Sequence, residues 1–226
     1  FSLINVRTKV EAYYQYLYKI PIEQKTPSGF SAINMADIYD LGNTAPLVSR
    51  GNGQNYGIDL SVEKPFSNNY YFMSALSLFN STYTNFAGKT FNSKYNRNYS
   101  FNIIGGKEWQ AKRNSHRVYG ASGKLLASGG VRNSVIDIPA SVAAGREELV
   151  ADQYYTKQGP VYFRFDFSAY IKTNRKRSTH TLSLEIQNAT NHQNLYGYYF
   201  DSRTGEQKTA WQLGILPNIG YKIEFH

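Results

Sequence analysis

The clearest feature of the sequence is a period of two in its hydrophobic and polar positions near the C-terminus. Over residues 211–225, alternate positions are apolar or aromatic and the positions between them are mostly polar. Successive side chains of a β-strand point to opposite faces, so this pattern predicts one long amphipathic strand that ends on Phe225. Its apolar face carries Trp211, Leu213, Ile215, Ile219, Tyr221, Ile223 and Phe225. His226 is interpreted as a candidate affinity-tag residue and is left out of the fold prediction.

The same period recurs along the chain and predicts about eight strands in all. The other segments that show it are residues 4–18, 56–63, 70–83, 101–108, 117–128, 163–172 and 182–187, although the two faces of 70–83 are hard to tell apart. Residues 21–52 and 129–160 break the pattern and predict two long loops. A short helix is expected within the second loop, over residues 139–150, with Pro139 near its first position.

The connections between the predicted strands alternate in length. In chain order they are long, short, medium, short, long, short and medium. In an up-and-down antiparallel sheet every second connection lies at the same end. We therefore expect one rim of tight turns and one rim of large loops, with both chain ends on the tight-turn side. Outer-membrane barrels sort their connections in this way, and an ordinary soluble sandwich has no reason to do so.

Composition agrees with a single domain rich in β-structure. The chain has 226 residues, 41% of them hydrophobic, and its 20 Tyr and 13 Phe suit strands and membrane-interface belts. The mean hydropathy of −0.50 resembles that of a soluble protein, but the two faces of a membrane barrel average out. No run of about 18 apolar residues exists, so no transmembrane helix is predicted. The absence of cysteine excludes disulfide bonds and thiolate metal sites.

The charge balance raises the question of nucleic acid. The formal net charge is +9, but the basic residues are scattered over strands and turns, so we expect no nucleic-acid partner. No signal peptide is found, and Phe1 opens directly into a strand pattern. We interpret the sequence as a fragment or a processed chain.

Taken in order, five stretches resemble the C-terminal barrel portion of TonB-dependent outer-membrane receptors, in particular those of Bacteroidetes. The matching stretches are residues 11–18, 51–60, 163–166, 184–191 and 216–225. Among them, Gln-Asn-Ala-Thr-Asn at 187–191 is similar to the Asn-rich strand end that precedes the last loop of such receptors. The resemblance runs essentially from end to end. It rests on the order and spacing of the stretches, since each one alone is weak.

The resemblance implies an all-β, antiparallel, up-and-down transmembrane β-barrel. Residues 1–225 would be about eight strands at the C-terminal end of a barrel of about 22 strands. The N-terminal barrel strands, the plug domain and the TonB-binding segment of the family have no counterpart in the chain. The alternative is a free-standing small outer-membrane barrel with a structural or passive role, because eight strands can close a barrel by themselves.

For function, the resemblance implies energy-coupled uptake of a scarce nutrient across the outer membrane of a Gram-negative bacterium. Iron chelates, cobalamin, peptides and glycans are all handled by the family. The implied partners are the rest of the same receptor, TonB acting through the missing N-terminal region, the barrel-assembly machinery, and outer-membrane lipid with lipopolysaccharide. The terminal strand would carry the assembly signal, with Tyr221, Ile223 and Phe225 as its residues.

No catalytic or metal-binding constellation stands out, so we expect no enzyme activity, no cofactor and no metal. None of His116, His180, His192 and His226 has short metal-ligand spacing to another histidine. No G-x-S-x-G motif occurs, so a barrel enzyme such as a lipase or protease lacks a visible nucleophile. Asp59 with Glu63, or Asp166 with Glu185, could be paired acids for hydrolysis. We favour the interpretation that these carboxylates belong to a polar lumen wall.

Two further sets of residues follow from the predicted strands and loops. The set expected to face the lumen is Arg7, Lys9, Glu11, Asp59, Glu63, Lys124, Arg164, Asp166, Lys172, Lys222 and Glu224. Binding residues concentrate on loops that a rigid scaffold holds, so substrate contacts are expected from the long loops. The candidates are Asp37, Tyr39, Arg50, Arg132, Arg146, Tyr154 and Tyr155.

Overall fold

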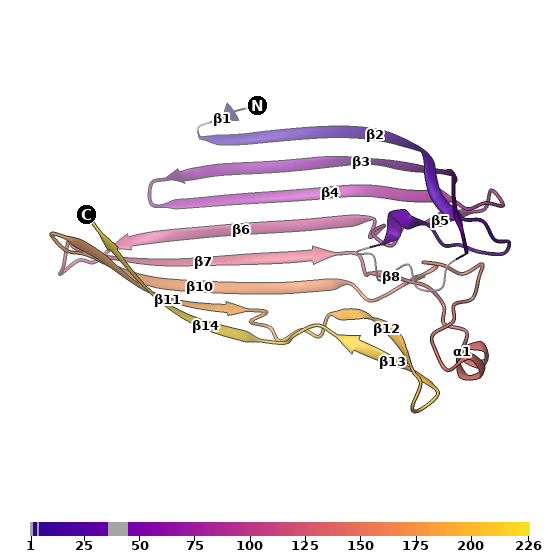
Figure 1. The fold of residues 1–226 in the computed structure, drawn as a ribbon. Helices are drawn as coiled ribbons and strands as arrows, with labels where there is room; N and C mark the ends of the chain where they lie inside the picture. The colour runs from indigo at the N-terminus through magenta and orange to yellow at the C-terminus, as the bar shows by residue number, and fades with distance from the viewer. Residues whose placement is uncertain (1, 4, 36–44) are drawn as a thin grey trace.

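The predicted strands form one antiparallel sheet in a computed structural model of the chain, which describes residues 2–3, 5–35 and 45–226. The long strands are β2 (Val6–Glu23), β3 (Leu47–Ser67), β4 (Tyr70–Thr84), β6 (Tyr99–Gln110), β7 (Arg117–Ser128), β10 (Tyr162–Asn174), β11 (Ser178–Gln187) and β14 (Leu216–Phe225). Each long strand pairs with the next one along the chain (Figure 1). The all-β antiparallel class is confirmed.

Shorter elements decorate this sheet. They are β1 (Ser2–Leu3), η1 (Ala32–Asn34), β5 (Thr90–Asn92), β8 (Arg132–Asn133), α1 (Ile138–Ala144), β9 (Lys157–Gln158), β12 (Leu195–Asp201) and β13 (Glu206–Trp211). β1 pairs with β2, and β5 extends β4. The pairs β8–β9 and β12–β13 form small sheets of their own. Apart from β1, all of these elements lie in the larger connections.

Tight turns and large loops are sorted to opposite ends of the sheet (Figure 1). The tight-turn rim consists of residues 68–69, 111–116 and 175–177. The loop rim consists of residues 24–35 and 45–46 and of the connections 85–98, 129–161 and 188–215. The β3–β4 turn shows why such a turn is short. Asn68 and Asn69 have φ angles of 51° and 65°, which a two-residue hairpin matched to the twist of its strands requires.

The predicted loop over 21–52 is wrong at both ends, because β2 continues to Glu23 and β3 begins at Leu47. The pairing of β2 with β3 shifts register between Leu17 and Ile20, and Lys19 has a φ of 54°. A bulge adds a residue to one strand and so reverses the period of two beyond it. Here a second register shift, between Ile20 and Pro21, restores the pairing, and Ile20 and Ile22 continue the apolar positions of the strand. The strand was predicted to end too early because Pro21 and the turn residues after it indicate a loop.

The predicted strand over 211–225 is two strands. Trp211 ends β13 and pairs with Leu195 of β12, whereas β14 begins at Leu216. The helix expected over 139–150 is α1, which begins as predicted, with Pro139 in its first turn and Asp137 as its N-cap. It ends at Ala144 because Gly145 adopts a left-handed φ of 66°.

The ladder gathers the charged positions of the strands on one face. Directly paired residues point to the same side of a sheet, so a row of pairs can be followed from Glu63 through Met73, Ile104 and Lys124 to Asp166. Rows of this kind show that a single face, here called the polar face, carries Arg7, Lys9, Glu11, Asp59, Glu63, Lys124, Arg164, Asp166, Lys172, Lys222 and Glu224.

The opposite, apolar face lies open to its surroundings. Val10, Ile58, Leu184 and Ile219 are 66%, 53%, 39% and 75% exposed. Buried hydrophobic side chains gather instead near the loop rim, in the cluster Ile20, Ile22, Tyr83 and Phe91. The sheet therefore presents an apolar surface that nothing within the described residues covers.

The strands are staggered in one direction across the sheet. One row of paired residues is Lys64, Phe72, Gly105, Gly123, Phe167, Ile186 and Pro217. It starts beside the tight-turn rim in β3 and ends beside the loop rim in β14. β14 and the β1–β2 pair form the two edges, and no pairing joins them within the described residues. The sheet is open and sheared.

Tyrosines on the polar face pack over glycines of the neighbouring strand. Gly120 and Tyr170 are direct partners, as are Gly106 and Tyr71. A Cβ atom at Gly120 would lie 2.2 Å from the Tyr170 ring, and one at Gly106 would lie 2.7 Å from the Tyr71 ring. Each glycine thus leaves the space that its partner's ring fills.

We expect Gly120→Ala to lower the free energy of unfolding by about 1–3 kcal/mol, because the new methyl group displaces the Tyr170 ring. The matched control is Gly105→Ala, where the nearest atom to a new Cβ is the Tyr71 carbonyl oxygen at 3.4 Å. Equilibrium unfolding of both variants measures the difference. Equal stabilities would contradict the role given to the Tyr170–Gly120 contact.

Candidate functional site at the loop rim

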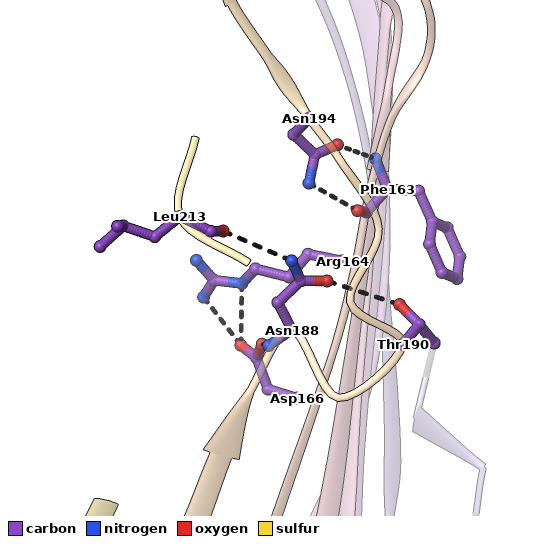
Figure 2. A network of polar contacts seen from close by, with 7 residues as sticks. All are labelled: Phe163, Arg164, Asp166, Asn188, Thr190, Asn194 and Leu213. Atoms are coloured by element: carbon purple, nitrogen blue, oxygen red, sulfur yellow. Dashed lines mark hydrogen bonds and ion pairs between the residues drawn. The ribbon is translucent and has the colours of Figure 1, made fainter. Parts of the chain in front are cut away.

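A buried asparagine holds the connection that follows β11. The Asn188 side chain is 1% exposed, and its amide donates to the carbonyl oxygens of His192 at 2.9 Å and Leu213 at 3.4 Å. Its side-chain oxygen accepts from the Thr190 hydroxyl at 3.5 Å (Figure 2) and from the His192 N–H at 3.1 Å. The Asn188 backbone N–H donates to the Asp166 carboxylate at 2.9 Å.

A second asparagine ties the same connection to β10. Asn194, which is 3% exposed, accepts from the Phe163 N–H at 2.9 Å and donates to the Phe163 carbonyl at 2.8 Å (Figure 2). The other oxygen of Asp166 binds the Arg164 guanidinium at 2.7 and 3.1 Å. Asn188, Asn194 and Asp166 thus fasten residues 188–194 and 212–215 to β10, and we call them the asparagine clasp.

The local backbone explains why asparagine stands here. Asn188 and Asn191 have φ angles of 50° and 51°, in the left-handed region that asparagine tolerates better than most residues. The Asn191 side chain accepts from the Ile215 N–H at 3.0 Å, which positions the chain just before β14. The Gln-Asn-Ala-Thr-Asn motif at 187–191 therefore has a structural account in this chain.

Arg132 binds the neighbouring connection. Its guanidinium donates to the Asn96 carbonyl at 2.7 Å and to the Asn98 side-chain oxygen at 2.9 Å. Asn96 is fully buried and donates to the side chains of Asn80 and Asn92, both at 2.8 Å. Burial lowers the pKa of Arg132, but the guanidinium stays charged in any accessible pH range.

The first long connection is held by a buried carboxylate. Glu23 accepts from the Ser28 hydroxyl and from the Ala45 N–H, the latter at 2.6 Å. The Asn85 amide donates to the Ser28 carbonyl at 2.7 Å. The Tyr154 ring lies against Gly29, where a Cβ atom would be 2.8 Å away. A polar contact thus joins residues 24–35 to the connection 85–98, and Tyr154 brings the connection 129–161 against the same residues.

Burial, and then the negative charges of Glu23 and Glu148, raise the pKa of Tyr154 to about 12. The phenol therefore stays neutral at physiological pH. Tyr154 and Tyr155 meet edge to face at 6.1 Å between ring centroids, and both pack on the buried cluster at the loop rim. Tyrosine rings here act as part of the loop-rim core.

The candidate ligand residues are not gathered into one site. Arg50 lies within β3, not in a loop, with its guanidinium 5.5 Å from the centre of the Phe86 ring. Arg146 pairs with Glu148 at 2.8 Å. Arg132, Tyr154 and Tyr155 support the loop rim as described above. Asp37 and Tyr39 lie outside the described residues.

The acidic residues of the polar face differ in their surroundings. Asp166 is occupied by Arg164 and by the Asn188 N–H, and Glu185 lies opposite Ser168 in the ladder. Asp59 lies opposite Glu11, and its Oδ1 atom is buried without a hydrogen-bond partner among the described residues. Among the residues that the structure describes, no group of three His, Asp or Glu side chains could hold a metal ion.

The residues of the predicted assembly signal lie on β14 and are exposed. Tyr221, Ile223 and Phe225 are 63%, 42% and 81% exposed. The Tyr221 hydroxyl contacts His180 Nδ1 at 2.7 Å. His226, set aside in the fold prediction, contacts the Thr179 hydroxyl through Nε2 at 3.1 Å. The apolar face of β14 thus reaches the tight-turn rim without a cover.

Comparison with known protein families, curated proteins and solved structures finds no match to this chain. In the described parts of the chain, no helix is long and apolar enough to cross a membrane. The functional argument therefore rests on the geometry of the sheet and its two rims.

Removing the buried amide should loosen the last connection. Asn188→Ala deletes the contacts to His192 and Leu213 and leaves alanine at a positive φ, at a combined cost of about 2–4 kcal/mol. We expect faster amide hydrogen exchange and faster proteolysis within 188–215. Asn218→Ala, an exposed position on the polar face of β14, is the matched control. Unchanged exchange in Asn188→Ala would contradict the role of the clasp.

The raised pKa of Tyr154 makes a pH-dependent contribution to stability. Because the unfolded phenol ionises near its ordinary pKa of 10 and the folded one near 12, this contribution is present below pH 10 and is lost between pH 10 and 12. It amounts to about 3 kcal/mol at most. We expect the stability difference between the wild type and Tyr154→Phe to shrink over that pH range in denaturant titrations. A constant difference would show that Tyr154 is not buried.

Proposed function

We propose that this chain is a section of the wall of an outer-membrane β-barrel, namely the C-terminal part of a TonB-dependent receptor that imports a scarce nutrient. The observation that carries the proposal is the open, sheared sheet with one continuous apolar face. The following paragraphs give the features that support it.

Aromatic side chains frame the apolar face at both ends. Near the tight-turn rim lie Tyr70, Trp109, Tyr119, Tyr221 and Phe225, here called the tight-turn belt. Nearer the loop rim lie Tyr14, Tyr16, Tyr56, Tyr99 and Phe163, here called the loop belt. The band between them is mostly aliphatic, with Phe72, Phe101, Phe165 and Phe167 as aromatic members. Membrane barrels have such a band between two aromatic girdles.

The strands are long enough for this role and are staggered as it requires. The shortest of the long strands, β11 and β14, have 10 residues each, and a tilted membrane strand needs about 9–11. A barrel closes only if its strands tilt and their register shifts by a fixed shear. The row from Lys64 to Pro217 shows a shift in one sense over seven strands.

Lys64, on the apolar face near the β3–β4 turn, is withdrawn from its surroundings. Lys64 is 5% exposed, and its ammonium donates to the Ser67 carbonyl at 2.9 Å, the Ser67 hydroxyl at 2.8 Å and the Tyr70 carbonyl at 3.0 Å. It also lies 3.6 Å from the centre of the Tyr70 ring. A charge next to lipid is tolerated when it is satisfied at the interface in this way.

In this proposal the polar face lines the interior of the barrel and meets the plug. Its charges alternate in sign, as in the Lys9–Glu11 pair at 2.7 Å and the Lys222–Glu224 pair at 2.8 Å. The loop rim faces outward and, with the plug, binds the imported nutrient. TonB acts on the plug and supplies the energy of import, so this chain contributes wall, loops and the terminal strand read by the assembly machinery.

A free-standing small barrel is the second candidate, and no observation favours it. It requires β2 to pair with β14, and within the described residues these strands form opposite edges of the sheet. Long unpaired edges invite association with further strands. A wall that neighbouring strands complete on both sides satisfies both edges.

A charge placed on each face tests the proposal. Leu184→Arg puts a cation in the middle of the apolar face, and Ser183→Arg puts the same cation on the polar face one residue away. We expect Leu184→Arg to destabilise the protein folded into phosphatidylcholine vesicles by about 2–4 kcal/mol. Ser183→Arg should have little effect on that stability. Tryptophan fluorescence during folding measures both. Equal effects, or a stable soluble monomer without detergent, would contradict the proposal.

A further inference from the structure

The tight-turn rim carries unpaired positive charge. The turns 111–117 and 174–178 contain no Asp or Glu, and their cations are Lys112, Arg113, Arg117, Arg175, Lys176 and Arg177. All six are exposed, and none forms an ion pair within the part of the chain that the structure describes. The two turns are neighbours, because Arg117 pairs with Thr173 and the Asn174 N–H donates to the His116 carbonyl at 2.8 Å.

The loop rim is different, because four of its cations have acidic partners. Arg146 pairs with Glu148 at 2.8 Å, and Lys208 pairs with Glu206 at 2.6 Å. Arg203 with Asp201 and Lys89 with Asp152 form further pairs at 3.4 and 3.6 Å. The two acids nearest the tight turns are occupied on the polar face, Glu108 by the Tyr170 hydroxyl and Glu224 by Lys222. The two tight turns therefore carry a cluster of cations that no acidic side chain among the described residues pairs with.

A shallow groove opens on the apolar face beside this rim. Gly105 and Gly123 are direct partners, and the same row continues to Phe72 on one side and Phe167 on the other. The groove has a volume of about 570 Å³. Above Gly105 there is free space, since a Cβ atom there would meet nothing closer than 3.4 Å.

Cations and aromatic rings stand at the rim end of the groove. Lys107 lines it on the apolar face, with its ammonium 5.8 Å from the centre of the Trp109 ring. Arg117 lies on the same face, beyond Tyr119, which pairs with Trp109. An apolar groove that ends in a cluster of cations complements a molecule with a hydrocarbon tail and an anionic head.

We propose that this rim binds an anionic phospholipid of the leaflet on the tight-turn side. One acyl chain lies in the groove over Gly105 and Gly123. The phosphate meets Lys107 and Arg117, and the cations of the two turns add to the attraction. This inference rests on the proposed membrane role of the apolar face, and it names the lipid class and the residues that select it.

Lipid retention tests the inference. The detergent-solubilised protein is mixed with equal amounts of phosphatidylglycerol and phosphatidylcholine, and bound lipid is counted by native mass spectrometry. We expect a preference for phosphatidylglycerol of at least about tenfold, since each cation near the headgroup contributes about fivefold. Lys107→Gln combined with Arg117→Gln should reduce this preference by at least about tenfold. Gly105→Leu, which fills the groove without changing charge, should lower retention of both lipids.

The matched control is Arg146→Gln combined with Arg203→Gln, which removes two exposed cations from the loop rim. It should leave the preference unchanged. Equal binding of the two lipids by the wild type, or an equal loss in the control, would overturn the inference. An unchanged preference in the Lys107/Arg117 variant would also overturn it and would point to an acidic protein partner for the rim. Folding into neutral phosphatidylcholine vesicles is measured separately, so failure there identifies a failure of the membrane role itself.

Discussion

An apolar sheet face without a cover is the constraint on which this structure depends. Burial of apolar surface is the main favourable term in folding, at about 25 cal/mol per Å². Here the fully buried hydrophobic cluster is Ile20, Ile22, Tyr83 and Phe91, and it lies near one end of the sheet. Soluble proteins rarely leave large contiguous apolar patches open, so the face points to an apolar surrounding. In the function proposed here, a lipid bilayer would supply that surrounding along the whole length of the strands.

The order of strand pairing then determines which connections lie at each rim of the sheet. Every long strand pairs antiparallel with the next one in the chain, so alternate connections lie at opposite ends of the sheet. One end therefore carries the tight turns and the other carries the large connections. The tight-turn rim keeps its charges free. The loop rim uses buried polar side chains such as Asn96, Asn188 and Asn194 as internal supports. Large loops can thus keep a defined shape above a sheet that offers them little hydrophobic core.

Much of the sheet could be predicted from the sequence, because most of the long strands have one charged and one apolar face. Prediction failed where another signal interrupted or imitated the period of two. Pro21 and the turn residues after it indicated a loop, although β2 continues to Glu23. Trp211 belongs to β13, although its position continues the apolar pattern of β14. The period of two runs on from one strand to the next, so it does not show where β13 ends and β14 begins.

The loop-rim site was harder to predict, since it depends on contacts between distant segments. Arg132 and Tyr154 looked like ligand residues because they are large and lie in loops, yet they support the loops themselves. The role of Asn188 follows from a positive φ and from partners on three segments. The groove over Gly105 and Gly123 exists only because the register places these two residues side by side. A spacing rule along one strand cannot supply that information.

The central claim is that the apolar face meets lipid and the polar face does not. The chain contains no cysteine, so a single cysteine can be introduced at each position from Ile58 to Glu63 and spin-labelled without interference. In vesicles, collision with oxygen, which dissolves in lipid, should be high at Ile58, Leu60 and Val62 and low at Asp59, Ser61 and Glu63. A water-soluble nickel complex should not reach the first set. Oxygen collision without a period of two, or free access of nickel to Ile58, Leu60 and Val62, would contradict the account.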